Sequence, residues 1–382
     1  MDQANHKRFG QLRSVAHSLT RDERWQALVA LLEDWPHEEL EQLALPYLSD
    51  LLRDDDSARE APQGWFCVDE NDIKVHPAWS LVRTLKREQS IINYAALTSA
   101  PHLSQLHTLD LSCCGVGVEG MALLATAPYL SDLMTLRLNY NELGDEGAIT
   151  LAKAKGLGGL TTLSLAMNRI GISGARALAK ALWLKGLKTL DLSHNHIGDE
   201  VKVFARSSAL KSLKTLNLAT NRIGDEGMVA LAKSPHLKQL TTLNLATNEI
   251  RNAGASALAK SSGLSGLTTL NLQANNIQTA GAVALAKSPY LSELTTLNMS
   301  LNKIRDTGAA ALAKSPHLKN LTTLILCNSG IGDEGAAALA QAEHLNKLTT
   351  LDLRRNQIGA AGEQALAQSP YLNEAIKAQW RR

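Results

Sequence analysis

The chain lacks any apolar run near the roughly 18 to 20 residues of a membrane helix, and its polar start, Met1 to Gln11, has no signal-peptide core behind it. We therefore expect a soluble, cytoplasmic protein that does not insert into a membrane. Cysteine is scarce as well, and the spacing of Cys67, Cys113, Cys114 and Cys327 matches neither a metal site nor a disulfide framework. We expect reduced thiols.

Catalytic signatures are also missing from the sequence. It contains no nucleophile elbow, zinc-protease helix, phosphate-binding loop or kinase signature, so it supports neither an enzyme nor a cofactor. Of the 382 residues, 45% are hydrophobic and 20% are charged, which is enough apolar material for a large core and too little charge for a disordered chain. The composition predicts a folded protein.

The net charge of +2 hides a division along the chain. Residues 1–72 carry 7 Lys and Arg against 16 Asp and Glu, whereas residues 73–382 carry 32 against 21, which gives −9 and +11. Such opposite charges predict either that the first segment docks on the rest of the chain or that the two segments meet different partners.

An internal repeat dominates the sequence. The pattern Leu-x-Leu-x-x-Asn, or a close variant, begins at ten leucines: Leu109, Leu136, Leu163, Leu190, Leu216, Leu243, Leu270, Leu297, Leu324 and Leu351. Successive copies are 27 residues apart, except for one step of 26 after Leu190, where the glycine expected after Glu200 is missing. Ten near-equal units predict a solenoid in which each copy packs on its neighbours.

Each copy predicts a strand, a turn and a helix. From Thr242 to Leu245, leucine alternates with polar residues, which is the pattern of a short strand with one buried face. The next asparagine, Asn248 in this copy, falls where the chain turns inward, and we expect its buried amide to bond backbone groups of its own and the neighbouring turn. Aspartates such as Asp225 are N-cap types, and the Ala-rich stretches that follow them favour helix.

The different widths of strands and helices predict the shape. Parallel strands lie about 4.8 Å apart and packed helices about 9 Å apart, so each unit must rotate relative to the previous one. The predicted fold class is α/β: an open horseshoe with a parallel sheet on its concave wall and helices on its convex wall.

The repeat resembles the ribonuclease-inhibitor type of leucine-rich repeat. The resemblance rests on Leu-x-x-Leu-x-Leu-x-x-Asn-x-Ile followed by Gly-x-x-x-Leu, as in Leu240 to Ile250 with Gly254 and Leu258, and it covers about residues 103–372. It implies a right-handed βα solenoid that binds a macromolecule, as ribonuclease inhibitors, NOD-like receptor sensor arms and Ran GTPase activators do. Ribonuclease inhibitors alternate two longer repeats, so a ribonuclease partner is not implied.

The two ends of the chain follow other patterns. Residues 1–64 are expected to form a helical N-terminal region and linker, with a capping box from Thr20 to Glu23 and a second helix interrupted near Pro46. A solenoid leaves an apolar face at each end, so caps are expected there. We place an N-terminal cap, the ten repeats and a C-terminal cap at residues 65–108, 109–372 and 373–382.

The concave face is the expected binding surface because it is the largest ordered surface of the predicted fold. Its candidates are a row of asparagines and, near it, non-repeating side chains of the types that anchor interfaces. They are Asn217, Asn244, Asn271 and Asn298 in the row, with Tyr140, Met167, His194, Arg354 and Arg355 near it. The alternative for the row is that duplication copied a harmless surface residue.

Other patterns have structural explanations. A cation at one helix position in seven successive repeats, from Lys153 to Lys314, predicts a basic stripe on the outer wall. No nucleic-acid motif or interleaved aromatic residue is evident beside it, and a solubilising face near helix C-termini accounts for it. His194 and His196 lack the further ligands that a metal needs, and the Gly-Asp-Glu-Gly turns are explained as helix starts.

The sequence thus predicts a monomeric, non-enzymatic module that binds an unidentified protein on its concave face, with no nucleic-acid partner, metal or cofactor. Two alternatives stay open. One is a GTPase-activating regulator similar to the Ran activators, and the other is a scaffold that binds an anionic polymer on the basic stripe.

Overall fold

The structure is a computed structural model that describes residues 3–18, 20–36, 39–52, 59–60, 80–86 and 94–381. It divides into two compact units, Met1–Asn168 and Arg169–Arg382, and each is considered by itself. Of the polar linker expected after residue 53 only residues 59–60 are described, and half of the expected N-terminal cap, together with Cys67, lies outside the described residues.

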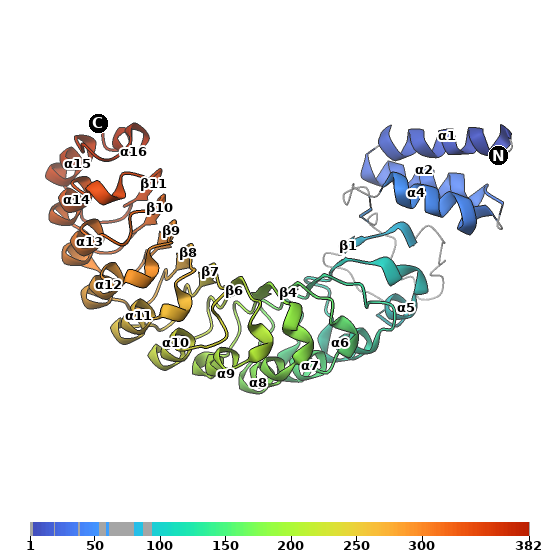
Figure 1. The fold of residues 1–382 in the computed structure, drawn as a ribbon, viewed down its shortest axis with the longest axis horizontal. Coiled ribbons are helices and arrows are strands. Elements are labelled where there is room, and N and C mark those ends of the chain that lie inside the picture. Colours follow the sequence, from blue (N-terminus) through green and yellow to red (C-terminus); the bar gives the residue numbers. More distant parts are fainter. Residues whose placement is uncertain are drawn as a thin grey trace. The chain divides into compact units, whose positions relative to one another are not determined.

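The first unit begins with helices and continues with strand–helix repeats (Figure 1). Its described elements are α1 (Gln3–Ser18), α2 (Arg21–Glu33), a π-helical turn (Leu40–Ala44), α4 (Leu45–Leu51), β1 (Thr84–Lys86), α5 (Tyr94–Ser99), β2 (Thr108–Asp110), α6 (Gly117–Thr126), β3 (Thr135–Arg137), α7 (Gly144–Ala152) and β4 (Thr162–Ser164). These strands pair in parallel and in sequence order. Strand β1 is an addition to the ten strands predicted from the repeat.

The N-terminal helices are tied to this first sheet. Helix α2 starts after Thr20 as predicted, but the predicted capping box does not form: Thr20 makes no side-chain cap bond, and its hydroxyl donates to the carboxylate of Glu23. The π-helical turn gives way to α4 just before Pro46, which is the predicted interruption. The buried Trp25 donates its indole N–H to the carbonyl of Glu60 at 2.8 Å, and Glu60 in turn bridges to β1.

The second unit is a regular series of the same repeats. Its described elements are α8 (Ile172–Lys180), β5 (Thr189–Asp191), α9 (Lys202–Ala205), β6 (Thr215–Asn217), α10 (Asp225–Ala232), β7 (Thr242–Asn244), α11 (Asn252–Ala259), β8 (Thr269–Asn271), α12 (Thr279–Ala286), β9 (Thr296–Asn298), α13 (Arg305–Ala313), β10 (Thr323–Ile325), α14 (Asp333–Ala340), β11 (Thr350–Asp352), α15 (Ala360–Ala367) and α16 (Glu374–Ala378). Strands β5 to β11 pair in parallel and in sequence order. Within this unit the strands line the inner side and the helices cover the outer side (Figure 1), which confirms the predicted α/β class.

The core lies between the strands and the helices of each unit. In the repeat around β7, Leu243, Leu245, Ile250 and Leu258 are each at most 1% exposed. Full burial of one such side chain stabilises the fold by about 1.5–3 kcal/mol, and because neighbouring repeats share these contacts, the stability is distributed along the solenoid. Among the described residues no helix is long and apolar enough to cross a membrane.

The predicted asparagine ladder is confirmed. Asn248 is 6% exposed, and its Oδ1 accepts the backbone N–H groups of Asn221 and Ile223 at 3.0 and 2.9 Å. Its Nδ2 donates to the carbonyls of Leu218 and Leu245, both at 3.0 Å. One side chain therefore satisfies buried backbone groups of two repeats.

The aspartates cap helices, but the prediction that each caps its own helix is wrong. Asp225 lies in the first turn of α10, which has no side-chain cap, and it accepts N–H groups of Arg251 and Gly254 at 2.8 and 2.7 Å at the start of the next helix, α11. A Cβ on Gly254 would lie 2.7 Å from this carboxylate oxygen, so the contact requires glycine. Equivalent side chains are Asp199, Asn252, Asp306 and Asp333. Each caps the helix of the following repeat and joins two repeats.

The 26-residue repeat has a different helix. Without the glycine found in the other copies, the chain forms a 3-10 turn over Gly198–Val201 and only a short α9. Phe204 occupies the helix leucine position and is fully buried. Glu200 is nearly buried, and its bond of 2.8 Å to Arg176 holds the pKa of Glu200 below its usual range.

Candidate functional site

Four asparagines lie side by side on the strands of the second unit. Asn217, Asn244, Asn271 and Asn298 are register partners across β6 to β9, where strand spacing is about 4.8 Å. Each is half-buried, and its Oδ1 accepts the backbone N–H two residues later at 3.0 to 3.2 Å. The row therefore has a structural role, because each amide fixes the bend at the end of its strand.

The same row also presents hydrogen-bond donors. With the oxygen held by the backbone, the group that each side chain offers on the sheet face is an amide NH₂. That of Asn298 donates to the side-chain oxygen of Gln273 at 3.0 Å. Half-buried threonines flank the row at the strand starts: Thr215, Thr242, Thr269 and Thr296. This neutral polar surface suits the carbonyl oxygens and uncharged acceptors of a protein.

The candidates beside the strand ends are exposed because the backbone turns there. Tyr140, Met167, His194 and Arg355 all have positive φ, between 55° and 59°, which directs each side chain away from the core. Tyr140 is 61% and Met167 is 44% exposed. Tyr140 and Met167 follow the neighbouring strands β3 and β4 of the first unit. His194 follows β5 and Arg355 follows β11, the first and last of the paired strands of the second unit, so the structure does not bring these two together.

Arg354 is oriented by an ion pair at the last strand. Its Nε and Nη2 donate to the two carboxylate oxygens of Asp352 at 2.9 and 2.6 Å, and these bonds lower the pKa of Asp352 to about 2. The Arg354 side chain is 82% exposed, so the pair contributes little to stability. Its effect is to hold a planar cation in a fixed direction on the strand face.

Each unit also has a hollow at its strand ends. The hollow of the first unit is lined by Cys113, Gly115, Gly117, Tyr140, Asn141 and Glu142. That of the second is lined by His194, Asn195, His196, Thr220, Arg222, Thr247, Asn248 and Glu249. From the sequence, His194 was a candidate for partner binding and, with His196, was weighed as a metal site. Among the residues that the structure describes, no three His, Cys, Asp or Glu side chains gather as a metal would require.

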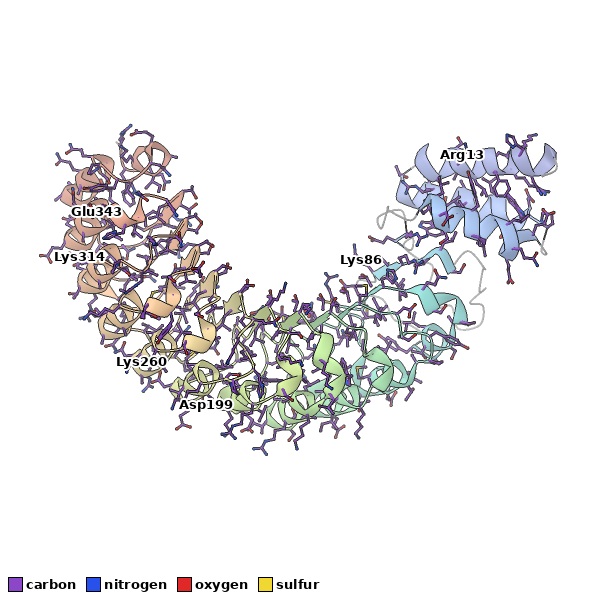
Figure 2. The ribbon with its side chains drawn as sticks, viewed as in Figure 1. Arg13, Lys86, Asp199, Lys260, Lys314 and Glu343 are labelled. Atoms are coloured by element: carbon purple, nitrogen blue, oxygen red, sulfur yellow. The ribbon has the colours of Figure 1, made fainter. Side chains whose placement is uncertain are left out.

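Sequence reasoning missed a row of rings beside the basic stripe. Most helices of the second unit end at an exposed lysine, and Lys260 and Lys314 point outward from the helical side (Figure 2). Three residues beyond this helix-end position, several repeats carry a ring: Trp183, His236, Tyr290, His317, His344 and Tyr371. In the repeats of His344 and Tyr371 the helix end carries glutamine, Gln341 and Gln368, instead of lysine. The interpretation that aromatic residues do not accompany the stripe is therefore corrected. The signal was available, because the last four rings are 27 residues apart.

Family comparison agrees with this geometry. A model described as Leucine Rich repeat matches residues 102–125, 129–152, 160–179, 236–259, 266–286, 291–313, 317–340 and 344–367. A second, described as Leucine Rich repeats (2 copies), matches residues 185–228. Together they cover more than half of the chain, and the chain belongs to the leucine-rich-repeat family.

Solved structures share the fold but little sequence. An internalin from Listeria monocytogenes is 20% identical with a TM-score of 0.57, and the alignment covers 96% of this chain and 93% of that one. The mouse RP105/MD-1 complex is 20% identical with a TM-score of 0.52, over 78% of this chain and 46% of that one. Such identities show the fold alone. A search of curated proteins finds no match.

Proposed function

We propose that the protein is a non-enzymatic recognition module that binds a protein partner on the strand face of its repeats. The observation that carries the proposal is the row Asn217 to Asn298, a neutral donor surface fixed by strand register, with the oriented cation of Arg354 beyond it. Leucine-rich-repeat proteins are typically binding modules without enzymatic activity, which supports the proposal.

The strand face also suits an interface by its geometry. A stable protein interface needs about 800 Å² from each partner, and a few aromatic or Arg side chains supply most of its energy. On the inner side of the second unit a globular partner can contact several strands at once, whereas on the outer helices it touches fewer repeats (Figure 1). We therefore infer that the asparagine row supplies area and that Arg354, Arg355 and His194 supply anchors.

Three finer statements belong to this proposal. The repeats are of the ribonuclease-inhibitor type, because Gly254 and Leu258 follow the asparagine turn at that family's spacing. The location is cytoplasmic, because Cys113 and Cys327 are free thiols. The protein acts as a monomer, with the domain boundaries given above. The GTPase-activator alternative is not favoured, because within the described residues 94–381 the turns between repeats are uniformly short and carry no insertion that could reach a nucleotide.

The test compares two sets of variants in the second unit. Asn244→Arg with Asn271→Arg places two long cations in the row, and Lys260→Glu with Lys287→Glu is the matched change on the outer side. Circular dichroism first shows that each variant is folded. A partner isolated by pull-down and then purified should bind the first variant at least about tenfold more weakly, a loss of about 1.4 kcal/mol, and the second within about twofold. Normal binding by the first variant with loss by the second overturns the proposal.

A further inference from the structure

Charge is divided between the two ends of the helices in the second unit. Acidic side chains stand in the first turns, including Asp225, Asp306 and Asp333. Exposed lysines stand at the C-caps: Lys233, Lys260, Lys287 and Lys314. Because the helices follow one another in the same direction, the cations of successive repeats gather along one flank. The helix dipole favours this placement, but it does not account for the rings found on the same flank.

The rings form a row next to the lysines. Tyr290 lies three residues after Lys287, and the next three repeats have a ring at the same position: His317, His344 and Tyr371. Tyr290 and Tyr371 are 38% and 37% exposed, and the His344 side chain is 42% exposed. Each ring precedes a fully or nearly fully buried leucine such as Leu291, so one residue anchors the turn in the core and the ring stays at the surface.

A buried serine fixes the turn that carries each tyrosine. The Ser288 hydroxyl donates to the carbonyl of Ala259 in the preceding repeat at 2.6 Å and accepts the backbone N–H of Tyr290 at 3.2 Å. Equivalent pairs of bonds join Ser315 to Ala286 and His317, and Ser369 to Ala340 and Tyr371. Two repeats therefore position the backbone of Tyr290, His317 and Tyr371 before any ligand binds, whereas the repeat of His344 has Ala342 in place of the serine.

We propose that this flank, formed by Lys287, Tyr290, Lys314, His317, His344 and Tyr371 and called the ring–lysine flank, binds an unpaired strand of nucleic acid. Such strands are bound by a positively charged track that follows the phosphates together with aromatic rings on which bases stack. A lysine row alone would attract any polyanion, and the rings add the preference for exposed bases. A duplex hides its base faces and cannot use them.

The spacing of the row is compatible with a flexible strand. Neighbouring strands are about 4.8 Å apart and neighbouring helices about 8–10 Å apart. The turns that carry the rings lie between the strands and the helices, so the distance between successive rings should lie between these two values. One carboxylate, that of Glu343, lies 3.9 Å from the His344 imidazole and weakens the positive field in that repeat. The repeats of Tyr290 and His317, each with its own lysine, therefore form the centre. This surface is separate from the strand face, so the inference does not depend on the proposed function.

The test uses the full chain and fluorescence anisotropy with a labelled oligothymidylate of about 20 nucleotides. Competitors are a duplex of the same length, heparin and polyglutamate. The ring variant is Tyr290→Leu with Tyr371→Leu, and Tyr140→Leu, which removes an exposed ring of the first unit, is its control. The lysine variant is Lys287→Gln with Lys314→Gln, and its control is Lys303→Gln, which removes an exposed cation in the segment after β9.

The single strand should bind more tightly than every competitor at about 0.15 M salt. The ring variant should bind at least about tenfold more weakly, and the lysine variant should reduce the slope of log affinity against log salt by roughly 0.7 for each lysine that contacts a phosphate. Both controls should bind within about twofold of the parent. Absence of binding overturns the proposal. So does equal or tighter binding of heparin or polyglutamate without a ring effect, which would indicate a general polyanion surface or a site for an acidic protein.

Discussion

Replacing one ladder asparagine by leucine is expected to destabilise the second unit far more than a change in the neighbouring concave row. Asn248→Leu keeps the size of the side chain but removes the acceptor of the Asn221 and Ile223 N–H groups. Each carbonyl that Asn248 bonds keeps a second hydrogen-bond donor in the variant. The loss of unfolding free energy therefore comes mainly from the two N–H groups. At about 1–3 kcal/mol for each stranded group, the loss is about 2–6 kcal/mol.

The matched variant lies four residues away in the same repeat. Asn244→Ala removes one bond, the Ala246 N–H to Oδ1 contact of 3.1 Å at a half-buried side chain, and should cost about 0.5–1.5 kcal/mol. Urea unfolding followed by circular dichroism measures both, and the midpoints are compared at unchanged slope. Equal midpoint shifts, or a leucine variant as stable as the parent, would refute the assignment of the two asparagines.

Further predictions concern other contacts. Gly254→Ala should destabilise the fold because its Cβ would meet the Asp225 carboxylate at 2.7 Å. Adding Asp225→Ala should recover part of the lost unfolding free energy. If the effects of the two substitutions on this free energy simply add in a double-mutant cycle, the clash is not the cause. Arg354→Ala should raise the pKa of Asp352 from about 2 toward about 3.9 in an NMR titration. Since the pKa of Asp352 is depressed in the folded state, the stability from this pair is present above about pH 4 and is lost as the pH falls toward 2. An unchanged Asp352 pKa in the Arg354→Ala variant would disprove the role of Arg354. Deleting residues 1–72 should lower the melting temperature because it removes Glu60, which accepts the Trp25 indole N–H and pairs with Thr84 of β1. An unchanged melting temperature in a monomer would indicate an independent domain.

Period and residue type were sufficient to predict much of the fold. Leucines at fixed spacing predicted the parallel strands, and the recurring asparagine predicted the ladder, because both depend on burial patterns that a repeat shows directly. The target of Asp225 was not predictable in the same way. Its side chain has ordinary N-cap chemistry, but only the stacking of repeats decides that the N–H groups it meets lie 26 and 29 residues further along the chain.

The binding surfaces were predicted less completely. The sequence predicted that Asn244 lies on the solvent-facing side of its strand, away from the core. Its bond to the backbone of Ala246 depends on the bend that follows β7, which the sequence did not predict. The rings such as Tyr290 were visible at the repeat period, but their place beside the lysines depends on the serine-held turn that separates helix from strand. Neither the bond of Asn244 nor the position of the rings beside the lysines follows from the repeated residues alone, because both depend on how the chain folds and stacks.

Photo-crosslinking from the strand face tests the central claim most directly. A photoreactive amino acid is placed at Asn271 in the concave row and, as control, at Lys260 on the outer helices, and the adducts are identified by mass spectrometry. The account predicts one recurring protein adduct from position 271, weakened by Asn244→Arg, and no such adduct from position 260. An adduct formed only from position 260, or one from position 271 that Asn244→Arg leaves unchanged, would contradict the claim that a protein partner binds along the asparagine row.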